Sequence, residues 1–211
     1  DDDLPESYPT HEVVTPKPTN SSSVNWVSAG KVNPIQNQGN CGSCWAFSAA
    51  AVMESAHAIF HSTLYKLSEQ NFVSCSGSYG NNGCNGGFYS NAWNYAKANK
   101  VESEANYPYT SGTTTKSGSC MYNSALGLVS TTGQADVLTD TTSIMTAIYQ
   151  QPQAVAIEAD TAYFQTYTSG ILTCMTCCGT TIDHAVTAVG YGMDPTYGGY
   201  YIVRNSWGTS W

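Results

Sequence analysis

Residues 38–48 read QGNCGSCWAFS and place Cys44 at the point where a loop turns into a helix. From Cys44 to Phe60 the chain is rich in alanine and lacks glycine and proline, so it can stay helical for several turns. A sulfur in the first turn of a helix lies at the positive end of the helix dipole, which favours the thiolate over the thiol. Because the thiolate is the nucleophile, Cys44 is suited to attack a carbonyl carbon once a base lies nearby.

This stretch resembles the active-site signature of the papain-like, cathepsin L-like cysteine proteases. Three more segments resemble the same family in the same order, and the resemblance extends from about Val24 to Trp211. They are GCNGG at residues 83–87, IDHAV at residues 182–186 and RNSWGTSW at residues 204–211. The resemblance implies an α+β, papain-like two-lobe fold, with a helical left lobe, a β-barrel-like right lobe and the active site in the cleft between them.

The distribution of helical and strand-like patterns also favours an α+β protein with two lobes. Helices are expected at residues 44–60, 67–73, 88–99 and 142–149, and strands at 154–157, 185–189 and 200–203. Five turn-forming residues are expected to break up the strand-rich part: Gly190, Gly192, Pro195, Gly198 and Gly199. We therefore expect a mainly helical lobe at residues 24–133, which carries the nucleophile, and a strand-rich lobe at residues 134–211.

His184 is the candidate base for Cys44, and the resemblance implies that it faces the thiol from the other lobe. An imidazole beside a thiol can take its proton, and each charge of the resulting ion pair stabilises the other. The imidazolium can then protonate a leaving amine. The remaining histidines, His11, His57 and His61, are interpreted as surface or half-buried residues.

Asn205 is expected to accept the second ring N–H of the histidine and so to fix its tautomer. Trp207 is expected to shield that hydrogen bond from water and to form part of the leaving-group side of the cleft. By the same resemblance, the side chain of Gln38 and the backbone N–H of Cys44 are the donors of an oxyanion hole. Taken alone, the NSWG segment would be interpreted as a turn after a strand, and Gln38 as a solvated loop residue.

Gly86 and Gly87 follow Cys84 directly, and their lack of side chains would let a peptide backbone approach and pair beside them. The same glycines are also compatible with a tight turn after a disulfide. The backbone of Asp183 is expected to offer a further acceptor near the scissile bond.

Four residues are expected to line the pocket for P2, the second residue before the scissile bond: Phe88, Tyr89, Ala156 and Ile182. All four are apolar or aromatic, so a hydrophobic P2 side chain should be preferred, and the small Ala156 leaves room for a bulky one. Core packing is the alternative for the aromatic pair. The loop between residues 109 and 120 is short and lacks paired histidines, which favours an endopeptidase with a groove open at both ends.

Eight cysteines indicate an oxidising compartment, and the resemblance implies how some of them pair. The implied disulfides are Cys41–Cys84 and Cys75–Cys120. Cys44 is expected to be free, and the pairing of Cys174, Cys177 and Cys178 stays open, although a bridge between the first two is conceivable. Relatives usually bridge the position of Cys178 to a cysteine near their C-terminus. We therefore expect that a C-terminal segment, which would close the base of the P2 pocket, is missing from this sequence.

The composition limits the partners of the protein. Only 10% of the 211 residues are charged and the formal net charge is −8, which argues against nucleic acid and anionic membrane surfaces. No apolar run is long enough to span a bilayer. Residues 1–23 hold four prolines among polar and acidic residues and are interpreted as an extended arm, either a propeptide remnant or a mature extension. Within the arm, Asn20 opens an N-glycosylation sequon.

The leading hypothesis is a monomeric cysteine endopeptidase, lysosomal, vacuolar or secreted, that forms an acyl-enzyme. It would act on polypeptides, use no metal or cofactor, and meet a propeptide or a cystatin-type inhibitor. A catalytically silent, papain-like binding protein is one alternative, but such proteins normally lack the nucleophile or the base. A thiol-disulfide oxidoreductase or metal module at Cys41 and Cys44 is another, although no second cysteine pair at zinc spacing accompanies this CxxC motif.

Overall fold

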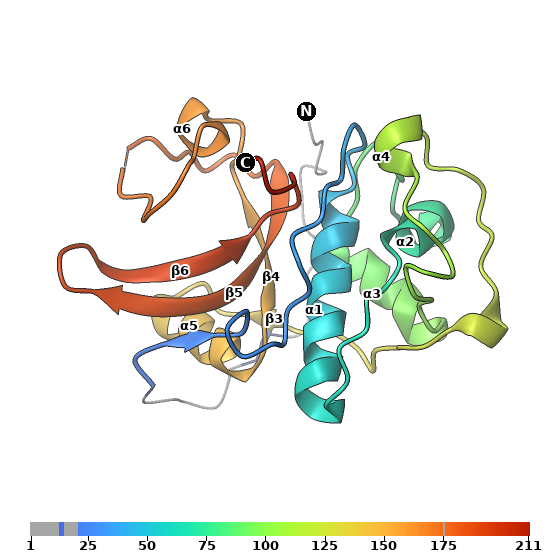
Figure 1. Ribbon diagram of the computed structural model, residues 1–211, viewed down its shortest axis with the longest axis horizontal. Helices are drawn as coiled ribbons and strands as arrows, with labels where there is room; N and C mark the ends of the chain where they lie inside the picture. Colours follow the sequence, from blue (N-terminus) through green and yellow to red (C-terminus); the bar gives the residue numbers. More distant parts are fainter. Residues whose placement is uncertain (1–12, 15–20, 175) are drawn as a thin grey trace.

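Helices and strands gather in two adjoining halves of the molecule, and one long helix lies between them (Figure 1). This computed structural model describes residues 13–14, 21–174 and 176–211. The arm expected at residues 1–23 lies largely outside the described residues, and His11 and Asn20 lie wholly outside them. Among the described residues, no helix has the length and apolar character needed to cross a membrane.

The helical half contains three main helices, whose limits lie within two residues of the expected ones. They are α1 (Cys44–His61), α2 (Glu69–Cys75) and α3 (Tyr89–Ala98). α2 begins after Ser68, whose hydroxyl accepts a hydrogen bond from the backbone N–H of Asn71 at 2.9 Å. α1 ends before Ser62, which adopts a left-handed conformation with a φ of 61°. The short helix α4 (Ser111–Thr114) completes this half.

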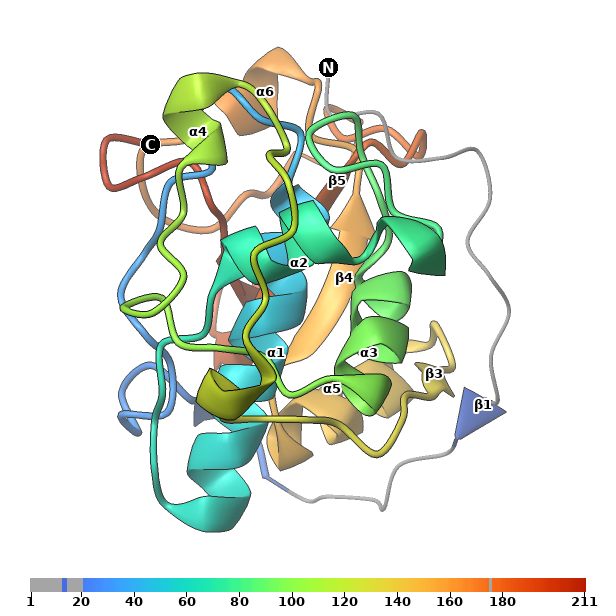
Figure 2. The same cartoon turned by 90° about the vertical axis from the view of Figure 1, so that its right-hand side faces the viewer.

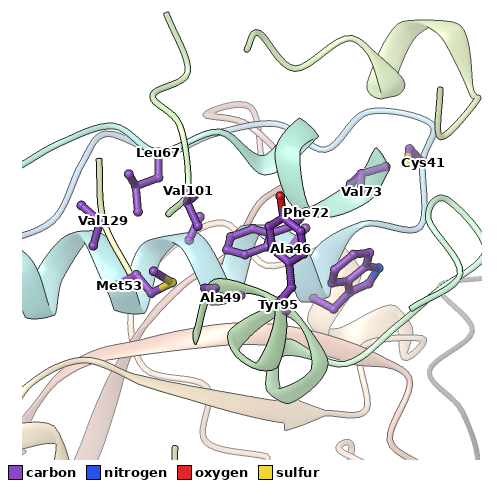
Figure 3. Close-up of a cluster of buried hydrophobic side chains, with 14 residues drawn as sticks. Cys41, Ala46, Ala49, Met53, Leu67, Phe72, Val73, Tyr95, Val101 and Val129 are labelled. Atoms are coloured by element: carbon purple, nitrogen blue, oxygen red, sulfur yellow. The ribbon is translucent and has the colours of Figure 1, made fainter. Parts of the chain in front are cut away.

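The first twelve residues of α1 are all buried, because neighbouring elements cover the helix on both sides. One face joins α2 and α3 in a hydrophobic core (Figure 3). The main members of this core are Trp45, Ala46, Ala49, Ala50, Met53, Leu67, Phe72, Tyr95, Val101 and Val129. The alanines let the neighbouring helices approach α1 closely, while each large side chain contributes roughly 1.5–3 kcal/mol by its burial.

The sheet half is built around the strand β5 (His184–Asp194), and every strand of this sheet is antiparallel to its neighbour. β4 (Gln153–Ile157) and β2 (Val24–Asn25) pair with successive parts of one edge of β5, and β6 (Gly198–Arg204) pairs with its other edge. The helices of this half are α5 (Thr141–Gln150) and α6 (Ala162–Gln165). Over the described residues this sheet stays open and does not close into a barrel.

A second, smaller sheet lies at the side of the molecule (Figure 2). It consists of β1 (Val13–Val14), which pairs in parallel with β3 (Asp136–Val137). The described residues that precede β2 therefore contact the sheet half at β3, and the hydroxyl of Tyr191 on β5 donates to the carbonyl oxygen of Ser21 at 3.1 Å.

The expectation that glycines break up β5 is wrong. The strand runs through Gly190 and Gly192 and only bulges between Ala188 and Gly190. A Cβ atom at Gly190 would collide with the carbonyl oxygen of Val24 on β2, and one at Gly192 would lie 2.6 Å from the hydroxyl oxygen of Tyr200 on β6. These glycines therefore allow neighbouring strands to approach closely, which is a common role of glycine inside a strand.

β6 likewise begins with residues 198–199, so the chain turns only at residues 195–197. The carboxylate of Asp194 fixes this turn by accepting hydrogen bonds from the backbone N–H groups of Thr196 and Tyr197, at 2.8 and 2.9 Å.

Helix α1 joins the two halves through a contact with β5. The buried hydroxyl of Ser48 donates a hydrogen bond to the carbonyl oxygen of Val186 at 2.9 Å. The hydroxyl of Thr187 in turn donates to the hydroxyl oxygen of Ser48 at 3.4 Å. This contact places the N-terminal end of α1 beside the first residues of β5. The boundary between the lobes at residues 133 and 134 stays a prediction.

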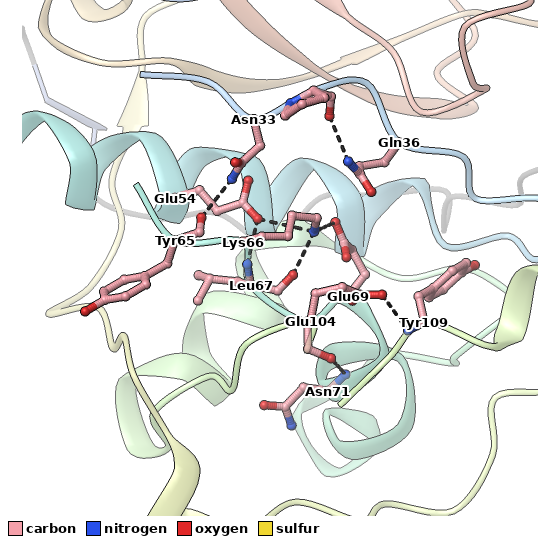
Figure 4. A network of polar contacts seen from close by, with 12 residues as sticks. Asn33, Gln36, Glu54, Tyr65, Lys66, Leu67, Glu69, Asn71, Glu104 and Tyr109 are labelled. Carbon is pink, nitrogen blue, oxygen red and sulfur yellow. Dashed lines mark hydrogen bonds and ion pairs between the residues drawn. The ribbon is translucent and has the colours of Figure 1, made fainter. Parts of the chain in front are cut away.

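A buried cluster of charges lies between α1 and α2 (Figure 4). The Nζ atom of Lys66 is 2.6 Å from Oε1 of Glu69 and 3.3 Å from Oε1 of Glu54, and both glutamates are almost fully buried. Burial raises the pKa of Glu69 to about 7; the Lys66 ammonium opposes this shift, and the Glu54 carboxylate adds to it. Two carboxyl groups thus share one ammonium, so Glu69 retains its proton in mildly acidic solution.

We expect Glu69→Gln to change how stability depends on pH. A carboxyl group whose pKa is higher in the folded state binds more protons there, so its stabilising effect is complete below about pH 4.5 and is lost as the pH rises through about 7. Between pH 4.5 and 8 the wild type should therefore lose on the order of 2 kcal/mol more unfolding free energy than Glu69→Gln. Urea unfolding over this range measures the difference, and parallel curves for the two proteins would contradict the assignment.

Candidate active site

Cys44 is the first residue of α1, so its sulfur lies in the first turn of an 18-residue helix. The thiol is free and only 1% exposed. Its Sγ atom accepts a hydrogen bond from the backbone N–H of Ala185 at 3.5 Å. Because Ala185 directly follows His184, this contact brings the candidate nucleophile against the backbone of the candidate base.

His184 is the first residue of β5 and is 1% exposed. Its Nε2 atom lies 2.7 Å from Oδ1 of Asn205. The same Oδ1 accepts the backbone N–H of Ser206 at 2.8 Å, so it must be the oxygen of the amide, and Nε2 must be the donor toward it. In the neutral imidazole this hydrogen bond leaves Nδ1 as the ring atom that can take up a proton.

Trp207 covers the imidazole on one side. The two ring centroids are 4.8 Å apart, with an angle of 33° between the ring planes. Phe164 and Trp211 pack around Trp207 in turn, each with a centroid distance of 5.6 Å. This aromatic cluster packs on the ring that bonds to Asn205, and the shielding of that hydrogen bond by Trp207 stays a prediction.

Gln38 lies in the helical half but is held by the segment that follows Asn205. Its backbone N–H donates to the carbonyl oxygen of Ser206 at 2.8 Å, and its Oε1 atom accepts the hydroxyl of Ser206 at 2.7 Å. Nε2 donates to the carbonyl oxygen of Cys41 at 3.2 Å. Gln38 is 3% exposed, so it is a buried residue and not a solvated loop residue.

Ser206 was not singled out in the sequence, although it holds both Gln38 and Asn205. No sequence motif assigns a role to a serine between Asn205 and Trp207. Its position next to the candidate Asn205 is the one signal that the sequence offers. The structure shows that its hydroxyl and both its backbone groups are used.

The glycine pair is constrained by the core of the helical half. A Cβ atom at Gly87 would lie 2.8 Å from the indole of Trp45 and 2.6 Å from Oδ1 of Asn81, and Gly86 has a φ of 100°. Gly87 is therefore required by internal packing, whatever its role toward a substrate. Both glycines are buried, and the pairing of a peptide along them stays a prediction.

Three of the four predicted P2 residues line one cavity of about 820 Å3: Tyr89, Ala156 and Ile182. Phe88 does not line this cavity and is 7% exposed, which corresponds to the core alternative for this residue. The cavity lies between the two halves and continues along α1 as far as His61. Apolar groups thus dominate the part of it that the sequence predicted.

Asp183 contributes its side chain as well as its backbone. The carboxylate accepts backbone N–H groups from Ala159 at 2.7 Å and from Asp160 at 3.1 Å, and the backbone N–H of Asp183 donates to Ile157 at 3.0 Å. These bonds fix the end of β4 against the residue that precedes His184. The sequence indicated only the backbone role, because a carboxylate that caps a loop leaves no pattern.

The other described histidines lie far from Cys44. His57 and His61 follow it by 13 and 17 residues along α1, which corresponds to roughly 20–25 Å at 1.5 Å per residue. His57 is half-buried and its Nδ1 atom lies 2.8 Å from the carbonyl oxygen of Thr63, and His61 is exposed.

The disulfides separate Cys44 from the other cysteines. The structure contains Cys41–Cys84, Cys75–Cys120 and Cys174–Cys177, while Cys44 and the exposed Cys178 are free. Because Cys41 is bound to Cys84, it cannot form a redox pair or a metal site together with Cys44. Across the described part of the chain, no group of three or more potential metal ligands comes together.

Comparison with known proteins identifies many relatives. Residues 20–211 match the family model described as "Papain family cysteine protease". Cathepsin L-like proteinase from Fasciola hepatica is 42% identical over 192 residues, which are 89% of this chain and 56% of the relative. Germination-specific cysteine protease 1 from Arabidopsis thaliana is 48% identical over 190 residues, 89% of this chain and 49% of the relative. The chain thus spans about half the length of the curated relatives it matches.

Two solved structures are similar over nearly the whole chain. Digestive procathepsin L 3 of Tenebrio molitor larval midgut superposes with a TM-score of 0.87 at 36% identity, covering 96% of this chain and 65% of that one. A recombinant stem bromelain precursor superposes with a TM-score of 0.83 at 39% identity, covering 90% of this chain and 61% of that one.

We expect His184→Ala to slow the alkylation of Cys44 by iodoacetamide at pH 6 by about tenfold, because the imidazole no longer takes the thiol proton. Asn205→Ala should slow the reaction less, since it removes only the acceptor that orients the ring. Mass spectrometry of the peptide that contains Cys44 measures the rate, and the exposed thiol of Cys178 is the internal control. Equal rates at Cys44 in the wild type and both variants would show that the two residues do not act on the sulfur.

Proposed function

Because this chain belongs to the papain family of cysteine proteases, we propose that it is a cysteine endopeptidase that cleaves polypeptides through Cys44 and His184. The papain-like fold predicted from the sequence is confirmed. One observation carries the proposal: the free thiol at the start of α1 lies 3.5 Å from the amide that follows His184, whose ring is oriented by Asn205. A nucleophile, a base and the group that orients the base thus come together from distant parts of the chain.

The proposed reaction begins when His184 takes the thiol proton of Cys44. The thiolate attacks the carbonyl carbon of the scissile bond, so a C–S bond forms and the π electrons move to the carbonyl oxygen. When this tetrahedral intermediate collapses, the C–N bond breaks and the imidazolium gives its proton to the departing amine. Water then attacks the thioester with His184 as base, which releases the carboxylic product and restores the thiol.

The negative oxygen of the intermediate needs hydrogen-bond donors. We assign this role to the side chain of Gln38 and the backbone N–H of Cys44, and one such donor is typically worth about 3 kcal/mol. Ser206 supports the assignment, because its hydroxyl occupies Oε1 of Gln38 and thereby orients the amide. Trp207 covers the imidazole, so the ion pair is kept from water.

The substrate is proposed to be a polypeptide with a hydrophobic residue at P2. The support is the part of the cavity that Tyr89, Ala156 and Ile182 line, since these three residues offer no charged partner to a P2 side chain that loses its hydration. The short loop between residues 109 and 120 supports cleavage within chains, because it lacks an insertion with paired histidines.

We also propose that residues 1–23 are an arm, either a propeptide remnant or a mature extension, and that the enzyme is lysosomal, vacuolar or secreted. The pairing of β1 with β3 supports an arm that contacts the sheet half at residues 13–14, which fits either origin. Disulfides in both halves support an oxidising compartment. Inhibition by a cystatin-type protein and a monomeric state belong to the same proposal.

A reactive epoxide tests the nucleophile. An epoxysuccinyl peptide should add one inhibitor mass to the intact protein and stop peptide hydrolysis, because the thiolate opens the epoxide ring. Cys44→Ser should abolish both effects, whereas the matched control Cys178→Ser, which removes the other free thiol, should keep both. Labelling that follows Cys178 instead, or no labelling of the reduced wild type, would refute the proposed nucleophile.

Peptide substrates that differ only at P2 test the specificity. We expect substrates with leucine or phenylalanine at P2 to exceed those with glutamate in kcat/KM by at least about tenfold. Ala156→Leu narrows the cavity, so it should lower kcat/KM for phenylalanine at P2 more than for valine. An unchanged phenylalanine-to-valine ratio in this variant would show that Ala156 does not line the P2 pocket.

A further inference from the structure

Tyr109 connects the two chain segments that carry the proposed oxyanion donors. Its hydroxyl donates a hydrogen bond to the backbone carbonyl oxygen of Gln38 at 2.8 Å. The same hydroxyl oxygen lies 2.7 Å from the hydroxyl of Ser43, the residue before Cys44. The tyrosine proton is directed to the carbonyl of Gln38, and the single proton of Ser43 has two acceptors within reach, the hydroxyl oxygen of Tyr109 and the carbonyl oxygen of Cys41 at 3.3 Å.

The ring of Tyr109 is fixed independently of these two bonds. It forms a T-shaped contact with Phe47 of α1, with ring centroids 4.9 Å apart and an angle of 85° between the ring planes. The backbone N–H of Tyr109 donates to Oε1 of Glu104 at 2.8 Å, beside the buried cluster of Lys66 (Figure 4). The hydroxyl is therefore presented by a side chain that is anchored at its backbone and along its ring.

The loop that follows Gln38 also rests against the segment that follows Tyr109. The backbone N–H of Asn40 donates to the carbonyl oxygen of Gly112 at 2.9 Å. Gly39 has a φ of 58°, and a Cβ atom there would lie 2.6 Å from that same carbonyl oxygen. A Cβ at Gly112 would lie 2.7 Å from the carbonyl oxygen of Gln38. The two segments thus touch backbone to backbone, and the loop has little freedom to move toward Tyr109.

We propose that Tyr109 is a positioning residue for the oxyanion hole, which its hydroxyl aligns by fixing the backbone of Gln38 against the turn that presents Cys44. This inference rests on the proposed function. The bond to the Gln38 carbonyl sets the peptide unit that carries the glutamine side chain. The bond to Ser43 sets the turn whose next N–H, that of Cys44, is the second donor. Oxyanion donors act only when they lie within a few tenths of an ångström of their productive place, so a small shift of either segment weakens both.

Tyr109→Phe removes only the hydroxyl and tests the proposal in the full chain. We expect kcat to fall about tenfold and KM to change less than about twofold, since the hole is needed in the transition state. The affinity for a peptide aldehyde, which forms a tetrahedral adduct with the thiol, should fall by about the same factor. The rate of Cys44 alkylation by iodoacetamide should not change, because that reaction creates no oxyanion. Tyr95→Phe, which removes a core hydroxyl bonded to Asn71, is the matched control and should leave all three quantities unchanged.

Combining Tyr109→Phe with Gln38→Ala tests whether Tyr109 acts through Gln38 or independently of it. With one donor already lost, adding Tyr109→Phe should lower kcat only about threefold further. A full tenfold further loss in this background would show that Tyr109 acts independently of Gln38 and would overturn the proposal.

The other outcomes are equally decisive. Unchanged kcat and aldehyde affinity in Tyr109→Phe would overturn the proposal, and so would an alkylation rate that falls in parallel with kcat. If Tyr109→Phe fails to fold, Ser43→Ala serves in its place, with an expected loss of about threefold in kcat and aldehyde affinity at an unchanged alkylation rate. A wild type without peptidase activity would defeat the proposed function itself, whereas an active wild type matched by Tyr109→Phe defeats only the role of Tyr109.

Discussion

Helix α1 is buried on both sides, and its contact with β5 determines where the chemical groups meet. Alanines on one face bring α2 and α3 close, and on the opposite face Ser48 bonds to the backbone of Val186. The N-terminal end of the helix therefore points at the first residue of the strand. Since Cys44 begins the helix and His184 begins the strand, one packing arrangement sets both residues. A shift of the helix along its axis would separate them at once.

A short strand-like pairing adds a second tie between the halves. Residues 36–38 run antiparallel to residues 206–208, with backbone bonds between Gln38 and Ser206 and between Gly208 and Gln36. The glutamine proposed for the oxyanion hole thus belongs to the helical half by sequence but is held by the segment that carries Asn205. Two hydroxyl groups also bond to this glutamine. Ser206, from the sheet half, donates to its side-chain oxygen, and Tyr109, from the helical half, donates to its backbone carbonyl oxygen.

The sequence predicted the fold class and the limits of the main helices well, because alanine content, helical patterns and the segment motifs all pointed the same way. It did not predict the continuity of β5, since glycine has two opposite uses. In a turn it permits unusual backbone angles, whereas at Gly190 it makes room for a neighbouring strand, and only the tertiary contacts distinguish these cases.

In the candidate site, too, some residues could be predicted from the sequence and others could not. Cys44, His184 and Asn205 stand in recognisable segments, and the structure places them in one network. Ser206, Tyr109 and the carboxylate of Asp183 serve it through hydrogen bonds to groups 168, 71 and 23 to 24 residues away. Such long-range partners leave no local spacing that a single sequence could reveal.

The contact of Gly87 with the indole of Trp45 has a consequence for how this groove can be redesigned. Trp45 also donates to the carbonyl oxygens of Gly42 and Gly83, and the Cys41–Cys84 bridge ties the same loop, so this wall moves as one body with the helix that bears the thiol. A directed-evolution library aimed at new cleavage preferences gains nothing from randomising position 87, where any added carbon atom would collide with the indole. Adaptable sites for such a library lie on the facing wall, at Ala156 and the half-exposed Ile182.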